Sequence, residues 1–221
     1  MSAPESASAS GSATSAASLG ALDLAALLCS RVCHDLISPV GAIVNGLEVL
    51  EEDKDEETKT FALDLIKKSA QQASAKLQFC RLAFGAAGSA GAQIDVGDAE
   101  KVARGLLGDD KTTIVWNLPR ELLPKNRVKL LLNMLLVAVG TIPRGGSITI
   151  DPTEGGKGFR LTASGLNARL AEATAGLLVG SPAHPVDAHA IQPLYTGILA
   201  RDCGLTVSAV AERESVVVTA S

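Results

Sequence analysis

The chain has 221 residues, of which 47% are hydrophobic and 20% are charged, and its formal net charge is -4. This length allows one large domain or two small ones with their own cores. Because the Lys and Arg residues are scattered and form no basic stripe, we expect no nucleic-acid partner. No uninterrupted apolar run reaches the ~18 residues needed to cross a bilayer, so we also expect no membrane partner.

The first nineteen residues are nearly all Ser, Ala and Gly. They lack the charged start and apolar stretch of a secretory signal, so residues 1–19 are predicted to form a flexible tail. Four cysteines are present without a CxxC pair, which indicates reduced thiols and a cytoplasmic protein. A metal or redox pair at Cys29 and Cys33, one helical turn apart, is the alternative to simple packing.

Residues 22–50 have the apolar periodicity of a helix, and residues 58–84 resume it after an acidic turn. Gly85 is a typical residue for the end of a helix. We therefore expect a helical hairpin over residues 20–86. Two helices of this length cannot bury all their apolar residues against each other, so the pattern predicts a homodimer whose two hairpins form a four-helix bundle.

The pattern changes after a linker of Ala, Gly and Ser at residues 86–92. Residues 93–221 mix helical and strand periodicity, which predicts an α+β domain with helices on one face of a sheet. The expected helices are 99–107, with Asp98 as N-cap, 125–139 and 191–203. The expected strands are 112–118, 147–151, 159–163, 205–210 and 215–219.

His34 is the main clue to function, because it points away from the apolar stripe of its helix. Winding the helix at about 100° per residue places seven apolar residues on one side. They are Leu28, Val32, Leu36, Pro39, Ile43, Leu47 and Leu50. His34 lies nearly opposite, on the side that carries Ser38, Gly41 and Asn45. An imidazole on the solvent side of a core helix, beside Asp35, is available for chemistry.

A neutral imidazole nitrogen can attack phosphorus, and the phosphoryl group on nitrogen is easily passed on. We expect Asp35 to accept a hydrogen bond from the His34 ring and fix its tautomer. Ser38, one turn later, is expected to position a water or a phosphoryl oxygen. Arg31 is the fourth candidate, because its charge can neutralise an acidic pocket on a partner. The alternatives are an ordinary surface His–Asp pair and a solvated arginine.

A docking surface for a partner is predicted around the same turn. Pro39 costs ~3 kcal/mol in a helix interior and should kink the helix at the site. Gly41 clears the surface below His34, so that the helix of a partner can approach. Ile37 and Asn45 complete the predicted docking set. For Ile37, the core of a helix bundle is the alternative.

The run His34-Asp35-Leu36-Ile37-Ser38-Pro39 resembles the phosphoacceptor motif of sensor histidine kinases. The hairpin and the domain after it resemble the dimerisation and ATP-binding domains of these enzymes. Together with Gly46-Leu47-Glu48, the motif is more similar to the dimeric histidine phosphotransferases of alphaproteobacterial phosphorelays. This resemblance implies a hairpin that forms a four-helix bundle on dimerisation, followed by a degenerate ATP-binding-like α/β sandwich.

Comparison with the kinase motifs implies that the nucleotide site is lost. Val137 stands where kinases place the asparagine that holds magnesium, and Ala163 and Asn167 replace an Asp and a Gly of the adenine motif. Residues 191–197 lack the glycines of the nucleotide lid. Asn133 remains, but one amide cannot hold a magnesium nucleotide. We expect this chain to bind no cofactor and no metal.

The family resemblance implies a place in a phosphorelay. The receiver domain of a CckA-like hybrid histidine kinase donates its aspartyl phosphoryl group to His34, and His34 passes it to the receivers of CtrA-like and CpdR-like response regulators of the cell cycle. Mg²⁺ is expected to come from the receiver partner. Two alternatives remain open, an ATP-dependent histidine kinase core and a non-catalytic dimeric scaffold that binds response regulators.

Overall fold

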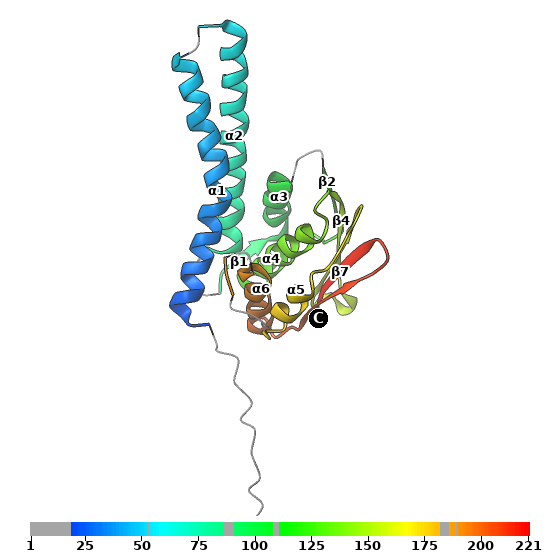
Figure 1. The fold of residues 1–221 in the computed structure, drawn as a ribbon. Coiled ribbons are helices and arrows are strands. Elements are labelled where there is room, and N and C mark those ends of the chain that lie inside the picture. Colours follow the sequence, from blue (N-terminus) through cyan, green and yellow to red (C-terminus); the bar gives the residue numbers. More distant parts are fainter. Residues whose placement is uncertain (1–18, 53, 86–90, 108–110, 182–185, 189) are drawn as a thin grey trace, which may run out of the picture.

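The computed structural model describes residues 19–52, 54–85, 91–107, 111–181, 186–188 and 190–221 (Figure 1). The predicted tail lies outside the described residues except for Leu19, and most of the predicted linker does as well. The described chain forms a long helical hairpin beside a smaller α/β domain. This architecture confirms the predicted fold class.

The hairpin consists of α1 (Ala21–Glu52) and α2 (Glu56–Ala83). Both predicted helices are confirmed and extend by one or two residues beyond most of their expected ends. Asp55 caps α2, because its side chain accepts a hydrogen bond from the backbone N–H of Thr58 at 2.9 Å. This bond and a second one from the Thr58 hydroxyl lower the pKa of the Asp55 carboxyl.

Small residues let the two helices approach each other closely. Gly46 of α1 is buried, and a Cβ added there would lie 2.6 Å from Cγ1 of Ile66 and 3.3 Å from the carbonyl oxygen of Ala62 on α2. Ala62 and Ser69 are themselves buried. The hairpin is thus held by a narrow seam, and much of the apolar surface of both helices stays outside it.

The second domain is built on a five-stranded sheet with the order β2-β4-β5-β7-β6. Only the pair of β2 and β4 is parallel. The strands are β2 (Thr112–Trp116), β4 (Gly146–Pro152), β5 (Phe159–Ser164), β6 (Val207–Ala211) and β7 (Ser215–Ala220). A separate antiparallel pair joins β1 (Gln93–Asp95) to β3 (Leu122–Pro124).

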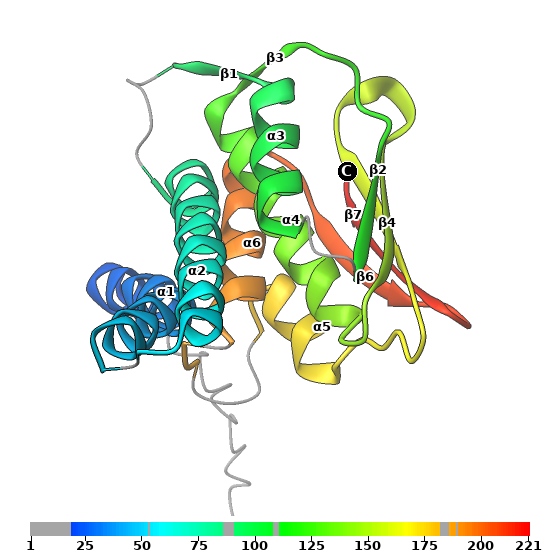
Figure 2. The same cartoon turned by 90° about the horizontal axis from the view of Figure 1, so that it is seen from above.

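The helices of this domain lie between the sheet and the hairpin, as Figure 2 shows from above. They are α3 (Val96–Leu107), α4 (Lys125–Thr141), α5 (Glu172–Leu178) and α6 (Ile191–Asp202), and a 3₁₀ turn covers Glu154–Gly156. The sequence did not predict β1, β3 or α5. Asp98 lies inside the first turn of α3, so its predicted capping role is wrong; Asp95 instead accepts from the N–H of Gly97 at 2.7 Å.

Strand alternation places the core on the helical side of the sheet. Ile148, Ile150 and Leu161 are fully buried, whereas their neighbours Thr149 and Thr162 are only partly covered. This is the pattern of a sheet with one covered face. The central helix, α4, is buried around most of its circumference because it lies between the sheet and the other helices.

A buried amide network joins the two domains. The side-chain amide of Asn133 on α4 donates to the carbonyl of Ala83 on α2 at 2.9 Å and to the carbonyl of Lys129 at 2.8 Å. Its oxygen accepts from the amide of Gln192 on α6 at 2.7 Å. Asn133 is completely buried and Gln192 is 4% exposed. The end of α2 is therefore tied to two helices of the second domain.

Apolar contacts reinforce this connection on both helices of the hairpin. The rings of Phe84 and Tyr195 lie 5.9 Å apart between their centroids. The first turns of α1 pack through Leu24, Leu27 and Leu28 against a cluster centred on Ile191, whose side chain is fully buried. The α/β domain is thus packed against the hairpin rather than suspended from a linker.

The apolar character of α1 corrects one expectation. By length and composition, α1 is long and apolar enough to cross a membrane. The expectation that no stretch of the chain is suited to a span is therefore wrong, because α1 keeps a high mean hydropathy although Gly, Ser and a few charged residues interrupt its apolar residues. A single such helix near the N-terminus is weak evidence for a span. The charged pair Arg31 and Asp35 also lies within it.

The seam predicts opposite effects for two glycines of α1. We expect Gly46→Ala to lower the free energy of unfolding by about 1–3 kcal/mol, because the new methyl group overlaps Ile66. Gly41→Ala is the matched control, since a Cβ there meets nothing within 4 Å. It should raise stability by up to ~1 kcal/mol through helix propensity. Urea denaturation followed by circular dichroism measures both, and equal effects would contradict the close approach at Gly46.

Candidate functional site

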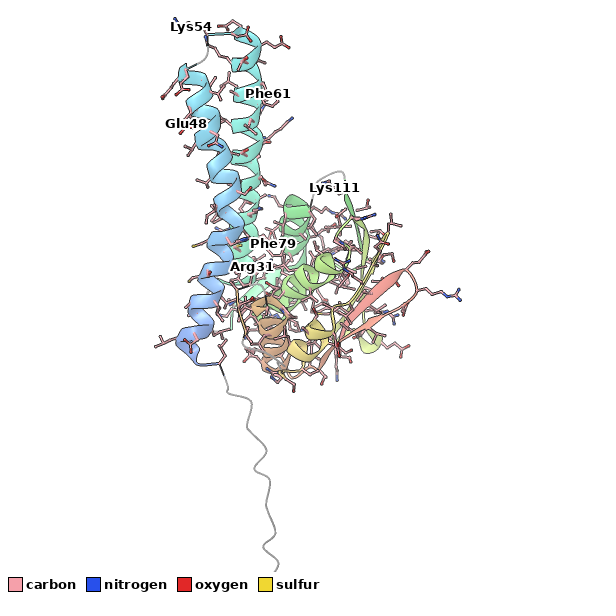
Figure 3. All side chains as sticks on the ribbon, in the orientation of Figure 1. Arg31, Glu48, Lys54, Phe61, Phe79 and Lys111 are labelled. Carbon is pink, nitrogen blue, oxygen red and sulfur yellow. The ribbon has the colours of Figure 1, made fainter. Side chains whose placement is uncertain are left out.

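His34 lies on the solvent side of α1 with 66% of its side chain exposed. It occupies the turn of α1 that begins with Arg31, which Figure 3 shows close to the level of Phe79 on α2. The more distant part of the hairpin, which carries Glu48 and Phe61, extends beyond the α/β domain. The imidazole is therefore accessible to a partner near the point where the hairpin meets the second domain.

Asp35 is the centre of the polar contacts around His34. One carboxylate oxygen, Oδ2, accepts from Nε of Arg31 at 3.0 Å, and the other, Oδ1, lies 3.6 Å from Nδ1 of His34. The second distance is longer than a hydrogen bond, yet it places the carboxylate beside Nδ1. A carboxylate beside Nδ1 favours the tautomer that carries its proton there, which leaves the lone pair on Nε2 for attack on phosphorus.

Pro39 leaves the backbone carbonyl of Asp35 without its normal helical donor, since proline has no N–H. Lys76 of α2 takes that place, with its Nζ donating to the Asp35 carbonyl at 2.8 Å. The turn that carries His34 is thus connected to the second helix at the gap. Sequence reasoning missed Lys76; the proline indicated that a donor was needed but could not say which residue supplies it.

Cys80 forms the inner side of this cluster. Burial raises the pKa of its thiol, and the nearby Asp35 carboxylate raises it further, while Arg31 and Lys76 act in the opposite direction. The same four side chains therefore influence one another across the two helices. The half-buried thiol is thus disfavoured as thiolate, which is the nucleophilic form of cysteine.

The structure brings together some of the predicted site residues and separates others. Arg31, His34 and Asp35 form one contiguous group, but the charge of Arg31 is directed at Asp35. Ser38 is exposed one turn further along the helix. Pro39 is buried and offers little surface to a partner, so its predicted docking role is wrong. Its burial agrees with its position in the apolar stripe of the helix.

The other predicted docking residues lie on two different sides of His34. Gly41 borders open space, and Asn45 is exposed on the same polar side. Ile37 is 69% exposed and belongs to an apolar strip on the other side, which we define as Ile37, Val40, Val44 and Leu47. Leu47, which belongs to the apolar stripe, is 47% exposed in the single chain.

The residues that replace the kinase nucleotide motifs lie in different surroundings in the α/β domain. Val137 and Ala163 are buried in the core. The only amide that sequence reasoning retained, Asn133, is occupied by the network between the domains. Asn167 adopts a positive φ of 63° in the loop after β5. Within the described residues, no group of three or more His, Cys, Asp or Glu side chains is arranged to hold a metal ion.

Comparison with known proteins agrees with this geometry. Residues 96–215 match the family model of the histidine phosphotransferase C-terminal domain. The protein phosphotransferase ChpT of Brucella abortus (strain 2308) is 52% identical over 205 residues, which cover 91% of this chain and 97% of that protein.

The chain belongs to the histidine phosphotransferase family. A solved structure of a bacterial phosphotransferase is also similar, with a TM-score of 0.81, 48% identity, and coverage of 92% of this chain and 98% of the other. This match extends over both the hairpin and the α/β domain. The chain is therefore a histidine phosphotransferase, and its predicted hairpin and α/β domain are both present in the solved phosphotransferase.

The buried network predicts that Asn133 holds the two domains together. We expect Asn133→Leu to lower the free energy of unfolding by about 1–3 kcal/mol, since it leaves the Ala83 carbonyl and the Gln192 amide without their partners. Asn126→Ala, which removes an exposed hydrogen bond to Asp202, is the control and should change stability by less than about 0.5 kcal/mol. Urea unfolding followed by the fluorescence of Trp116 compares them.

Proposed function

We propose that this phosphotransferase carries phosphoryl groups between receiver domains on His34. The observation that supports this most directly is an exposed imidazole on a core helix whose Nδ1 faces the Asp35 carboxylate. The donor is proposed to be the receiver aspartate of a CckA-like hybrid histidine kinase. The acceptors are proposed to be receiver aspartates of CtrA-like and CpdR-like response regulators.

The first transfer step moves one phosphoryl group from oxygen to nitrogen. The lone pair on Nε2 of His34 attacks the phosphorus of the aspartyl phosphate, the P–N bond forms, and the P–O bond breaks. The aspartate of the receiver leaves as a carboxylate with the bonding electron pair. The ring keeps its proton on Nδ1 and becomes positively charged, which the Asp35 carboxylate 3.6 Å away stabilises.

The second step reverses this chemistry with another receiver. Its aspartate oxygen attacks the phosphorus, the P–O bond forms, and the P–N bond breaks. The imidazole leaves with the electron pair and returns to its neutral form. Both steps require in-line approach and neutralisation of the phosphoryl charge. We assign the required Mg²⁺ to the receiver, because the described residues of this chain offer no cluster of metal ligands.

We propose that the apolar strip on α1 pairs two copies of the chain. Val40 follows Pro39 by one residue and Leu47 by eight, which turns them by about 100° and 80° from the buried side. In a square four-helix bundle each helix contacts two adjacent helices that lie about 90° apart around its axis. Val40 and Leu47 therefore face the position that a helix of the second copy would occupy. On α2, Leu63 and Leu77 are likewise more than half exposed in the single chain. His34, about 120° from Val40, stays outside this contact.

The opposite side of His34 suits the receiver. Here the surface consists of Ser38, Gly41 and Asn45, and a Cβ at Gly41 would have nothing within 4 Å. Small side chains lower the steric barrier to a close approach by another helix. Arg31 adds positive charge near the acidic pocket that a receiver aspartate implies.

We place the protein in the cytoplasm and expect it to work without ATP. The four cysteines are unpaired in the structure, as in a reducing compartment. An ATP-dependent kinase remains the alternative activity, but Val137 and Ala163 supply neither a metal ligand nor an adenine acceptor. A scaffold would bind receivers without ever becoming phosphorylated.

The relay predicts that label appears on His34 only when a phosphorylated receiver is added. The protein is incubated with a radiolabelled hybrid-kinase receiver, with unlabelled ATP or without nucleotide, and the labelled residue is mapped by mass spectrometry. A parallel reaction contains radiolabelled ATP alone. We expect label from the receiver in the parent and none in His34→Ala. Label from ATP alone would indicate a kinase, and receiver binding without label would indicate a scaffold.

The proposed dimer predicts that Val40→Glu separates the two copies. A charge in the apolar strip loses its hydration when the strip is buried, so association should weaken by at least about tenfold. Light scattering after size-exclusion chromatography gives the mass. Asn45→Glu adds the same charge on the polar side and should leave the mass that of a dimer. A parent that elutes as a monomer at micromolar concentration would contradict the pairing.

A further inference from the structure

Because Pro39 has no N–H, the backbone carbonyl of Asp35, the residue after His34, has no helical hydrogen-bond donor. A buried or half-buried carbonyl without a donor costs free energy, so such a group is normally satisfied from elsewhere. In this chain the donor comes from the other helix, because Lys76 Nζ lies 2.8 Å from the Asp35 carbonyl oxygen. The contact joins residues 41 positions apart in the sequence.

The charges around this contact do not cancel. The Asp35 carboxylate pairs with the Arg31 guanidinium at 3.0 Å, and the Lys76 ammonium binds the backbone of the same residue. Two cations therefore contact Asp35, Arg31 at its carboxylate and Lys76 at its backbone carbonyl, and Asp35 directly follows His34 in the sequence. A phosphoryl group arriving on the ring brings negative charge, and fixed cations nearby stabilise it without having to reorganise.

We propose that Lys76 is a positioning residue for phosphoryl transfer at His34. It acts through Asp35: by closing the gap that Pro39 leaves, it holds the turn that carries the histidine, and it leaves the site with an excess positive charge. This inference rests on the proposed function, since it assumes that His34 carries the phosphoryl group. Lys76 makes no direct contact with His34 in this account.

The test measures transfer from a phosphorylated receiver domain to the full chain under single-turnover conditions. The maximal rate and the half-saturating receiver concentration are determined for the parent, Lys76→Met and Lys76→Arg. We expect Lys76→Met to lower the maximal rate by about tenfold or more and to change half-saturation by less than about twofold. Lys76→Arg, which keeps both donor and charge, should recover most of the rate.

Lys68→Met is the matched control. It removes one positive charge from the exposed surface of the same helix, two turns from Lys76, and should transfer at the parental rate. An equal loss in Lys68→Met and Lys76→Met would show that only net charge matters and would overturn the proposal. Circular dichroism and dimer mass confirm that each variant is folded.

The effect of Lys76→Met is also measured in a chain that carries Pro39→Ala, which tests the role of the proline. In Pro39→Ala the Asp35 carbonyl regains a helical N–H donor, so Lys76→Met should reduce the rate less than it does in the parent. Equal reductions in both backgrounds would overturn the link through the carbonyl. If Lys76→Met does not fold, the same comparison is made with Lys76→Gln, which keeps a donor without charge.

The outcome for His34 separates this inference from the proposed function. Absence of label on His34 in the parent would contradict the relay itself. Label on His34 in the parent, with an undiminished rate in Lys76→Met, would contradict only the role of Lys76.

Discussion

The hydrogen bond from Asn133 to the carbonyl of Ala83 is the constraint on which the arrangement of the two domains depends. It lies in a completely buried environment, where an unpaired amide or carbonyl is costly, and the side-chain N–H of Gln192 donates to the Asn133 oxygen. Breaking the contact between α2 and α4 would expose these groups together with the apolar cluster around Ile191. The α/β domain therefore behaves as a fixed support of the hairpin, and the helix that displays His34 is held at one end.

Within this frame, the same sequence feature has two consequences at the site. Pro39 is buried on α1, and it also removes the donor for the Asp35 carbonyl. Lys76 then connects the helices through that carbonyl, while Arg31 engages the carboxylate. The histidine is exposed, but the adjacent Asp35 is held twice, by Lys76 at its backbone carbonyl and by Arg31 at its side chain.

Long periodic elements could be predicted from the sequence, whereas contacts across elements could not. The helices α1, α2 and α4 follow from continuous apolar periodicity, and His34 follows from its phase on α1. The strands β1 and β3 have three residues each and exist through their pairing, which no local pattern reveals. Lys76 is similarly invisible, because only the packing of two helices brings it to Asp35. Asn133 was noticed as a remnant of a nucleotide site, but its role in joining domains needed the fold.

The packed interface between the domains has a thermodynamic consequence for recognition. A catalytic domain that swings on a linker must lose conformational freedom each time a complex forms. Here that freedom is already lost in the isolated chain, since Tyr195, Asn133 and the Ile191 cluster hold the domain in place. An incoming protein that touches both domains would meet a preorganised surface, and the entropy of ordering them would not be subtracted from its affinity.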